Sequence, residues 1–518
     1  MKKIYMIILA VAAGVFLIHP DLDAQAFEWP DLGEALVIEP GPPGKINETI
    51  KGDTTATGER AHQHYILKRG QLYLYTASIN NVGWDLMVEA EEGDGALPVI
   101  KALGPPEGSD EAPRPFTSQG NIFLKGLNMS GWDQLDFPTD NATVRLNADD
   151  IKGVIIGCIF DFNRQNSFRT NNRGTMFFLE NNIIYGQGRA EQMQNGSALN
   201  ARGNFSPVVI YRNNTIVNVT NTITENMQTK RYGKWIFDHN TIVNIGRQGS
   251  DWGRPDSLIF TNNLVINPMI LGDGVVGDRS RFAEPWFAFH LDSNFVEEIV
   301  GVDTSMVFQP PYVEYDNNWV YVDPAVAAFL PDSSKPANLF MYDEQMQDIV
   351  DASTNTQILS EAFAFTNFPT AAANYEAYIA DYYSVAEVPA QLPGFDLDPA
   401  TEVDFGYATT HPAYTAAAGG KPLGDLNWHD VSSGVRDMMK QVHLKVYPNP
   451  VGLYFIIDAG QEIDRVEILN ILGQPVKDLK VPSLGSEVLV NSSDLDAGIY
   501  FVRCSYQNRM VGSYKITK

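Results

Sequence analysis

Hydrophobic and polar positions follow a phrase that occurs four times between residues 177 and 268. Each copy holds three to five apolar or aromatic residues, then a polar pair that is usually Asn-Asn, and then a second run rich in Ile, Val and Thr. The copies are residues 177–184, 209–216, 235–242 and 258–265, at intervals of roughly 23 to 32 residues. The pattern predicts two short β-strands joined at a sharp corner and repeated along the chain.

A repeat of this length indicates a solenoid, because each copy can bury its apolar face only against its neighbours. Asn tolerates the left-handed backbone that a sharp corner demands. Its side chain can also bond to the Asn one coil away, about 4.8 Å along the stack. The Asn pairs therefore predict an internal ladder; the alternative is that they are ordinary turn residues between hairpin strands.

The four copies resemble the right-handed parallel β-helix of the pectin-lyase-like superfamily, whose coils carry an inward Asn ladder. Residues 123–129 and 154–160 fit the same frame with Gly at the corner, and residues 315–320 fit it downstream. The expected fold class is all-β: a right-handed parallel β-helix solenoid, followed by a mixed, partly helical segment and a small C-terminal β-sandwich. This fold hosts many functions, so it does not by itself give an activity.

The residue just before the polar pair forms a predicted column on the solenoid. Strand alternation places it opposite the inward apolar residues, so the column should face outward. It can be a stabilising charge ladder, or part of a carbohydrate site in which Glu180 and Asp238 bind calcium and Arg212 pairs with a uronic acid. In successive matches the column reads Lys125, Ile156, Glu180, Arg212, Asp238, Thr261 and Asp316.

The loops between the copies concentrate Lys and Arg in a chain that is otherwise acidic. Loops that leave the same side of consecutive coils lie side by side and can build the wall of a groove. The alternative is that these are solvated loop charges with local ion pairs. The residues we consider for substrate binding are Arg189, Arg202, Lys234, Trp252 and Arg254, and those for catalysis include Lys230 and Arg231.

The N-terminal residues 1–26 combine Lys2 and Lys3, an apolar run and the small-residue site Ala24-Gln25-Ala26. This order predicts a secretory signal peptide, with a membrane anchor as the alternative. No other stretch approaches the roughly 20 apolar residues needed to cross a bilayer. Residues 27–324 are then the expected β-helix with its N-terminal cap, since an open solenoid end would expose apolar side chains and unpaired backbone groups.

Residues 325–441 lose the alternation and contain helix-forming Ala, Glu and Gln with many aromatics, among them Phe363 and Phe365. We expect short helices, at 325–330, 343–350 and 374–383, and loops that pack on the solenoid, followed by a linker at 429–441. The aromatics can stack on sugar rings or simply cement a cap. Residues 419–428 resemble a segment that closes many exported β-helix proteins of Bacteroidetes.

Residues 442–518 hold several short alternating strands separated by Gly- and Pro-containing turns, which predicts a small β-sandwich. The segments 447–450, 470–474 and 497–502 closely resemble the type A C-terminal sorting domain of the type IX secretion system. The resemblance implies export from a Bacteroidetes-type bacterium, with release or surface attachment, and the secretion machinery as a partner.

The formal net charge of −26 argues against nucleic acid or an anionic membrane as a partner. It is compatible with calcium as a cofactor, and it requires a local basic patch or a bridging cation for any anionic substrate. The two cysteines, Cys158 and Cys504, fall in different predicted domains. A disulfide framework is therefore not expected, and both cysteines should be small buried hydrophobes.

The sequence leaves two functions open. One is a polysaccharide lyase that acts on an acidic polymer. Such an enzyme needs a cation or an Arg to neutralise the uronate carboxylate of the substrate, and a base to remove the C5 proton of the sugar. The other is a non-catalytic adhesin or glycan-binding solenoid.

Residues 235–239 resemble the Trp-Ile-Asp-His run of pectate lyases, but Phe237 is an extra residue that reverses the faces of the residues after it. The catalytic candidates are Lys230, Arg231, Arg212 and His239. A glycoside hydrolase using Asp238 and Asp251 is a third possibility.

Overall fold

A computed structural model describes two parts of the chain, with short gaps. The first runs over 29–268, without 94, 105–112, 135–138, 140–141, 189–194, 204, 226–230, 247–249 and 252–253, and continues at 287–288, 312–327, 357–358, 363–368 and 403–429. The second is 445–518 without 471–473 and 507–508. The predicted signal peptide and the linker from 430 onward lie outside these residues, as do the predicted helices at 343–350 and 374–383.

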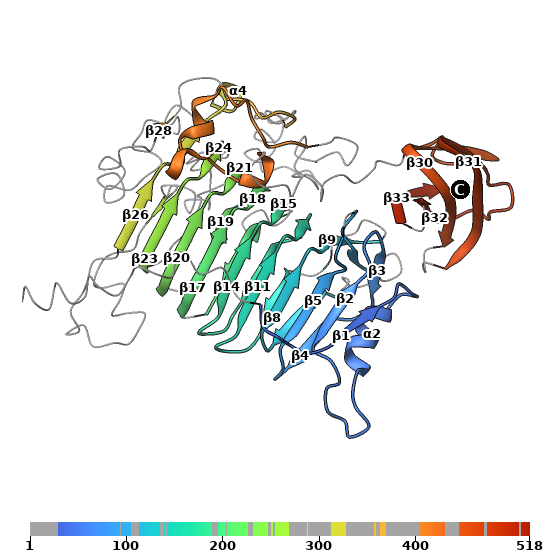
Figure 1. The fold of residues 1–518 in the computed structure, drawn as a ribbon, viewed down its shortest axis with the longest axis horizontal. Coiled ribbons are helices and arrows are strands. Elements are labelled where there is room, and N and C mark those ends of the chain that lie inside the picture. The colour runs from blue at the N-terminus through green and yellow to red at the C-terminus, as the bar shows by residue number, and fades with distance from the viewer. Residues whose placement is uncertain are drawn as a thin grey trace, which may run out of the picture.

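The described coils build three parallel sheets, so the chain folds as a parallel β-helix (Figure 1). Sheet 1 consists of β1 (Ala35–Ile38), β2 (His64–Leu67), β5 (Leu86–Ala90), β8 (Ile122–Lys125), β11 (Lys152–Ile156), β14 (Met176–Glu180), β17 (Phe205–Arg212), β20 (Arg231–Asp238), β23 (Arg254–Thr261) and β26 (Tyr312–Asp316). Sheet 2 consists of β3 (Leu72–Tyr75), β6 (Val99–Ala102), β9 (Asn128–Asp133), β12 (Ile159–Asp161), β15 (Ile183–Gln187), β18 (Thr215–Val219), β21 (Thr241–Ile245), β24 (Leu264–Ile266), β27 (Trp319–Tyr321) and β28 (Gln357–Ile358). Sheet 3 consists of β4 (Ile79–Val82), β7 (Phe116–Gln119), β10 (Ala142–Leu146), β13 (Asn166–Thr170), β16 (Ser197–Ala201), β19 (Thr222–Glu225), β22 (Ser250–Asp251) and β25 (Phe287–Ala288).

The repeated phrase supplies the strands of sheets 1 and 2, and the segment between two phrases supplies the strand of sheet 3. The predicted frame is confirmed, because Val209 pairs in register with Phe177 on one side and with Trp235 on the other. The less regular segment before residue 115 also forms coils, as predicted. Sheet 2 continues to β28, past the predicted end of the β-helix at residue 324.

The corner between sheets 1 and 2 carries the predicted ladder. The first residue of each polar pair has a left-handed backbone, with φ of 57° at Asn181, 56° at Asn213 and 53° at His239. The second residue of each pair is buried and stacks: Asn214 Nδ2 donates to Asn240 Oδ1 at 3.0 Å and to the carbonyl of Leu179 at 2.9 Å. The same ladder runs through Asn182, Asn214, Asn240, Asn263 and Asn318. Gly126 and Gly157 take the left-handed corner in the upstream coils, with φ of 65° and 63°.

A second Asn ladder, which we did not predict, lies at the corner between sheets 2 and 3. Asn218, Asn244 and Asn267 have φ of 58°, 57° and 50°. Asn244 Nδ2 donates to Asn218 Oδ1 at 3.0 Å, and Asn267 Nδ2 donates to Asn244 Oδ1 at 2.9 Å. The two ladders satisfy buried polar groups at both corners, which fixes the coils in register.

The interior between the three sheets is apolar and continuous along the solenoid. Aromatic rings stack from coil to coil, for example Tyr211 on Phe237 with 4.6 Å between ring centroids, and Phe260 on Tyr315 with 5.2 Å. At the N-terminal end, helix α2 (Lys45–Gly52) places Ile46 and Ile50 in the same core. This helix forms part of the cap that the sequence required.

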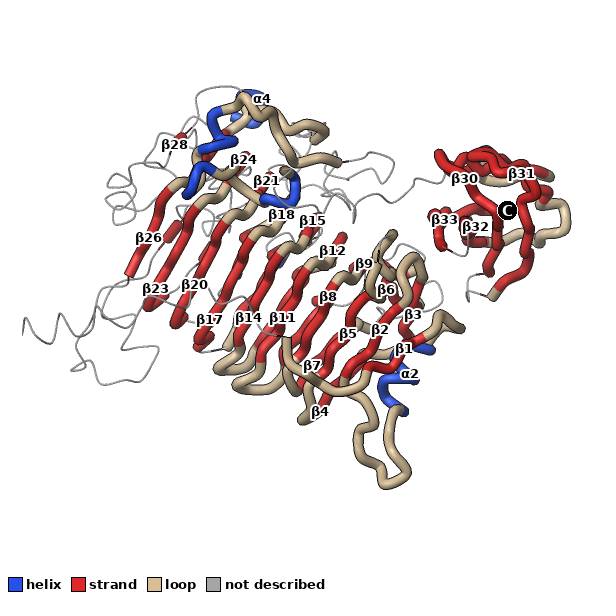
Figure 2. The backbone as a smooth tube through the Cα atoms, in the orientation of Figure 1, coloured by secondary structure: helices blue, strands red, loops and turns tan. Residues whose placement is uncertain are grey.

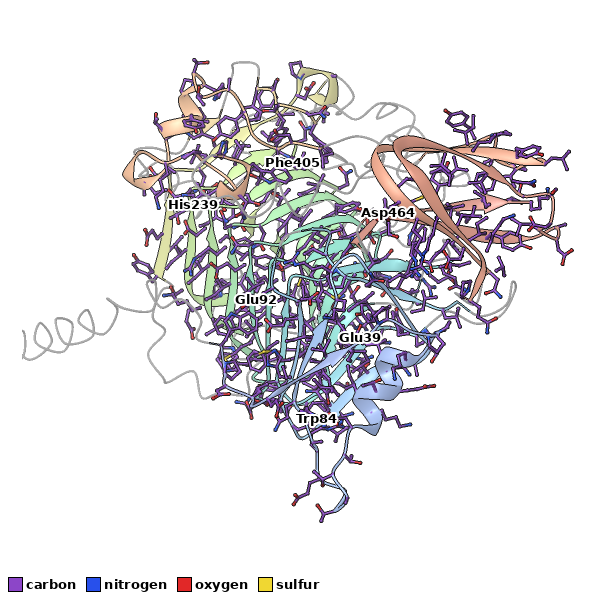
Figure 3. All side chains as sticks on the ribbon, turned by 45° about the vertical axis from the view of Figure 1, so that its right-hand side comes forward. Glu39, Trp84, Glu92, His239, Phe405 and Asp464 are labelled. Atoms are coloured by element: carbon purple, nitrogen blue, oxygen red, sulfur yellow. The ribbon has the colours of Figure 1, made fainter. Side chains whose placement is uncertain are left out.

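Residues 363–368 and 403–429, which we call the strap, cover the downstream part of the outer face of sheet 2 (Figure 2). Phe363, Phe365, Phe405 and Trp428 are buried there, so the cap-forming interpretation of the aromatics is confirmed for Phe363 and Phe365. Figure 3 labels Phe405 in this region. The expected helices of this region are, where described, one short α-helix, α4 (Pro324–Ala327), and three 3-10 turns, η5 (Pro412–Thr415), η6 (Ala418–Gly420) and η7 (Leu426–Trp428).

The C-terminal segment is an antiparallel β-domain with its own core. Its strands are β29 (Lys445–Tyr447), β30 (Tyr454–Asn470), β31 (Pro475–Asn491), β32 (Ile499–Tyr506) and β33 (Arg509–Thr517). Phe455, Ile468, Val490 and Val502 are among its buried residues. Cys158 in the β-helix and Cys504 here are both buried and free, as expected, and burial raises the pKa of each thiol to about 12.

Candidate functional site: an arginine cluster on sheet 3

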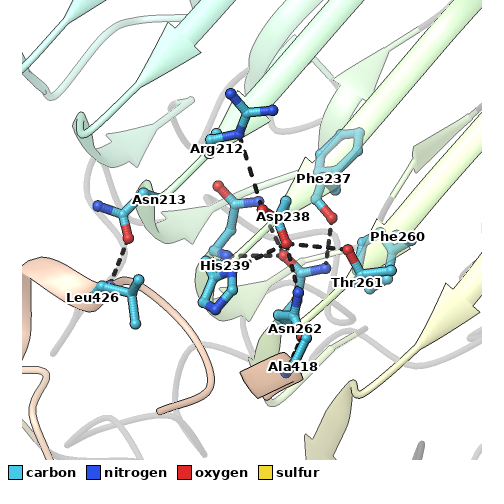
Figure 4. A network of polar contacts seen from close by, with 12 residues as sticks. Arg212, Asn213, Phe237, Asp238, His239, Phe260, Thr261, Asn262, Ala418 and Leu426 are labelled. Atoms are coloured by element: carbon cyan, nitrogen blue, oxygen red, sulfur yellow. Dashed lines mark hydrogen bonds and ion pairs between the residues drawn. The ribbon is translucent and has the colours of Figure 1, made fainter. Parts of the chain in front are cut away.

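The residues that precede the polar pairs form a column on sheet 1, as predicted. Glu180, Arg212 and Asp238 are direct register partners in it. At its centre Asp238 is held by several donors (Figure 4). Its Oδ1 accepts from Asn262 Nδ2 at 2.7 Å, Thr261 Oγ1 at 3.1 Å and His239 Nδ1 at 3.0 Å. Burial acts to raise the pKa of Asp238, but these donors outweigh it and lower the pKa. Asp238 is thus satisfied by its neighbours.

The two residues predicted to bind a metal are not neighbours. Glu180 and Asp238 lie two strands apart, about 9.6 Å along the stack, and the strand between them carries Arg212. Arg212 Nε lies 3.9 Å from Asp238 Oδ2, which places a cation of the protein itself beside that carboxylate. Within the described part of the chain, no three or more His, Cys, Asp or Glu side chains are grouped so that they could hold a metal ion.

The other candidate residues are spread over the solenoid. Arg231 and Arg254 are register partners at the starts of β20 and β23, seven residues and so about 23 Å from the end of β20 that carries Asp238. Lys234 lies between these ends, on β20. Arg189, Lys230 and Trp252 lie outside the described residues. The structure therefore brings Arg212 and His239 together but places Arg231 at the opposite end of the sheet.

Arg202 belongs to a different part of the solenoid, because it directly follows β16 of sheet 3. Its Nε donates to Asn200 Oδ1 at 3.0 Å. Asn200 Nδ2 in turn donates to Glu225 Oε2. Asn200 is also the register partner of Arg169 on β13. Arg202 is thus tied to a column of polar side chains that runs along this sheet.

This column contains two adjacent arginines. Arg145 on β10 and Arg169 on β13 are direct register partners, so their Cα atoms lie about 4.8 Å apart. Strand alternation turns them outward, because their neighbours Val144 and Phe168 are buried in the solenoid core. From β7 to β19 the column reads Thr117, Arg145, Arg169, Asn200 and Glu225.

Arg169 is the most buried member of what we call the arginine cluster: Arg114, Arg145, Arg169 and Arg202. Its side chain is 9% exposed, and its Nε has no hydrogen-bond partner. Burial, followed by the charges of Arg202, Arg145 and Arg114, lowers its pKa to about 10, although Glu225 acts in the opposite direction. The charges that act most strongly on Arg169 are thus three other arginines and one glutamate, in a chain whose net charge is −26.

Sequence reasoning named Arg202 and missed the other three arginines. The strands of sheet 3 fall between the copies of the phrase, so the phrase does not show which of their residues are neighbours. A signal was present, since residues 142–146 and 166–170 both place Arg between two inward residues of a short strand. Guanidinium groups bind carboxylate, sulfate and phosphate groups through paired N–H donors. The arrangement is therefore suited to holding an anion.

Comparison with known families identifies a secretion system C-terminal sorting domain over residues 445–517. This confirms the predicted type IX sorting domain and marks the chain as a secreted or cell-surface protein that interacts with the secretion machinery. A search of curated proteins finds no significant match. Among the described residues, no helix is long and apolar enough to cross a membrane.

Proposed function

We propose that this exported protein binds an acidic polysaccharide on the outer face of sheet 3, at the arginine cluster. The observation that carries the proposal is Arg169, which is buried beside three other arginines and has an Nε without a hydrogen-bond partner. Like charges placed directly opposite each other on a sheet destabilise it. An anionic group from a ligand would relieve this repulsion and fill the open donor.

The shape of the solenoid supports a polymeric ligand. Coils repeat about every 4.8 Å along the axis, so the members of one column on sheet 3 lie in a straight, evenly spaced row. The column there continues from Arg169 to Asn200 and Glu225, which are buried. Asn200 bonds to Glu225 and to Arg202, so these two residues hold the arginines in place. The strong negative charge elsewhere in the chain favours binding at the cluster over unspecific attachment of a polyanion.

The test is a binding titration of the full chain with alginate, pectate and glycosaminoglycans, with an uncharged glucan as the reference polymer. We expect Arg169→Met to weaken binding of the acidic polymer by at least tenfold, and added salt to weaken the binding of the unmodified chain. Arg212→Met is the matched control, since it removes the same charge from sheet 1 and should leave the affinity unchanged. Equal losses in both variants, or no binding to any acidic polymer, would contradict the proposal.

A second candidate function is β-elimination on the same polymer, which the grouping of Arg169 with Arg114, Arg145 and Arg202 favours, since several cations could hold one carboxylate. A base must remove the proton next to the uronate carboxylate while other cations hold that carboxylate. An unsaturated product, followed by its ultraviolet absorbance and absent in Arg169→Met, would support this activity; binding without product would leave the protein as a glycan-binding solenoid.

A further inference from the structure

The outer face of sheet 2 changes character along the solenoid. In its downstream part, the third residue of each strand is apolar and covered by the strap, as at Val217, Val243 and Ile266. In register with them, the preceding coils carry Tyr185 and Asp161. Ser130 continues the same column one coil further upstream. The column thus turns from apolar at Val217 to polar at Asp161 and Ser130.

Three partly exposed aromatic rings surround this polar stretch. Trp132 on β9 packs against Phe162, with 4.9 Å between ring centroids. Phe162, directly after β12, packs against Tyr185 on β15 with 5.2 Å between centroids. The rings come from three consecutive coils, and together they form an apolar patch beside the Asp161 carboxylate.

Phe162 occupies an unusual backbone position. Its φ is 48°, in the left-handed region that disfavours bulky residues. The equivalent corner residues of the next coils are Gly186, with φ of 68°, and Asn218, with φ of 58°. A Cβ at Gly186 would lie 2.8 Å from the Phe162 ring, so the glycine leaves room for that ring. An aromatic is therefore placed where Gly or Asn would be less strained, and strain of this kind is concentrated at functional sites.

Asp161 supplies an open acceptor next to the rings. Its Oδ2 accepts from the Tyr185 hydroxyl at 3.3 Å, whereas its Oδ1 is buried and has no hydrogen-bond partner. Burial raises the pKa of Asp161, although Ser130 and the charge of Lys101 act in the opposite direction. A buried acceptor without a partner is costly unless a ligand donates to it.

We propose that Trp132, Phe162, Tyr185 and Asp161 form a binding site for an uncharged pyranose ring. The apolar C–H face of such a ring stacks on aromatic side chains, and one of its hydroxyls donates to Asp161 Oδ1. The Asp161 carboxyl group disfavours a uronate or a sulfated sugar at this place. The site lies on sheet 2 and uses no residue of the arginine cluster, so it does not depend on the acidic-polysaccharide proposal.

The experiment titrates the full chain with uncharged gluco-, manno-, galacto- and xylo-oligosaccharides and follows binding by calorimetry and by saturation-transfer NMR. We expect Phe162→Asn to weaken binding at least tenfold while the folded structure persists, because Asn already occupies this corner in three later coils. Tyr185→Phe keeps the ring and should weaken binding less than Phe162→Asn. Arg169→Met should bind the uncharged sugar as the unmodified chain does.

Three results would overturn the proposal. One is the absence of binding to every oligosaccharide of the panel by the unmodified chain. The other is unchanged affinity in both Phe162→Asn and Asp161→Asn, with circular dichroism showing both variants folded. Loss of uncharged-sugar binding in Arg169→Met would place that ligand on sheet 3 and would likewise contradict a site on sheet 2.

Discussion

Two groups of polar side chains on the same solenoid are built differently. One is the arginine cluster of sheet 3, and the other, which we call the corner network, lies where sheet 1 ends and consists of Arg212, Asn213, Asp238, His239, Thr261 and Asn262 (Figure 4). In the corner network, Asp238 is satisfied by Asn262, Thr261 and His239. In the arginine cluster, Arg169 stands beside Arg145, and its Nε has no hydrogen-bond partner.

We take this difference to separate a structural role of the corner network from the ligand-binding role that we propose for the arginine cluster. Charges that satisfy each other across strands stabilise the sheet, whereas like charges opposite each other destabilise it. The corner network also holds the strap: Asn262 Oδ1 accepts from the Ala418 amide at 2.9 Å, and Asn213 Oδ1 accepts from the Leu426 amide at 2.6 Å (Figure 4). We therefore expect substitutions in the corner network to change stability and substitutions in the arginine cluster to change binding.

The largest expected effect concerns Asp425, which is fully buried where the strap meets sheet 2. Burial raises its pKa to about 7, although donors on Asn427 and Thr215 act in the opposite direction. Between pH about 4 and about 7 the folded chain therefore keeps a proton that the unfolded chain has lost. Stability must fall as the pH rises through this window, by an amount on the order of 4 kcal/mol for this group.

The matched variant is Asp425→Asn, which cannot ionise. Denaturant unfolding followed by tryptophan fluorescence should give similar stability for both chains near pH 4 and a less stable unmodified chain near pH 8. An unmodified chain that gains stability relative to Asp425→Asn as the pH rises would show that the bonds from Thr215 and Asn427 outweigh burial.

The next effect comes from the inner ladder. Asn240→Ala removes the acceptor of the Asn214 amide and the donor to the Tyr211 carbonyl, both inside the corner. Leaving these backbone groups unsatisfied should lower the free energy of unfolding by about 3 kcal/mol. The same substitution at exposed Asn80 is the control, and equal midpoints for both variants would show that the ladder does not stabilise the coils.

The sequence predicted the ladder and the charged column because both recur at a fixed place in one phrase. It did not reveal the second ladder at Asn218, Asn244 and Asn267, although each follows a similar apolar run. The strap could be expected only as a packing segment, because its contacts join residues far apart in the chain, such as Thr215 with Asp425.

The arginine cluster was harder to predict for the same reason. Arg145 and Arg169 become neighbours only when the strands of sheet 3 are aligned, and the loops that separate these strands from the phrases differ in length. Burial and missing partners cannot be read from a sequence at all. The predicted candidate Arg212 is paired with Asp238, whereas the unpredicted Arg169 has an open Nε.

A smaller effect is expected for the carboxylate at the centre of the corner network. Asp238→Ala removes one acceptor from Asn262, Thr261 and His239 and should destabilise the β-helix by about 1.5 kcal/mol. Binding of an acidic polysaccharide should not change, since sheet 3 is untouched. Asp238→Asn keeps an acceptor oxygen and should recover part of the loss. A large change in affinity with Asp238→Ala would move the binding site to sheet 1.

The smallest effect has the opposite sign and is the sharpest test of the contrast. Arg169→Met removes a buried charge from among three like charges and leaves a flexible apolar chain in its place. In the absence of ligand, it should raise the free energy of unfolding by about 1 kcal/mol, because the repulsion with Arg145 disappears.

The control is Arg212→Met, which instead leaves Asp238 without its cation and should lower the free energy of unfolding slightly. Both are measured by denaturant unfolding at low salt, where surface electrostatics are least screened. If Arg169→Met proved the more destabilised of the two, Arg169 would be a structural residue like Asp238.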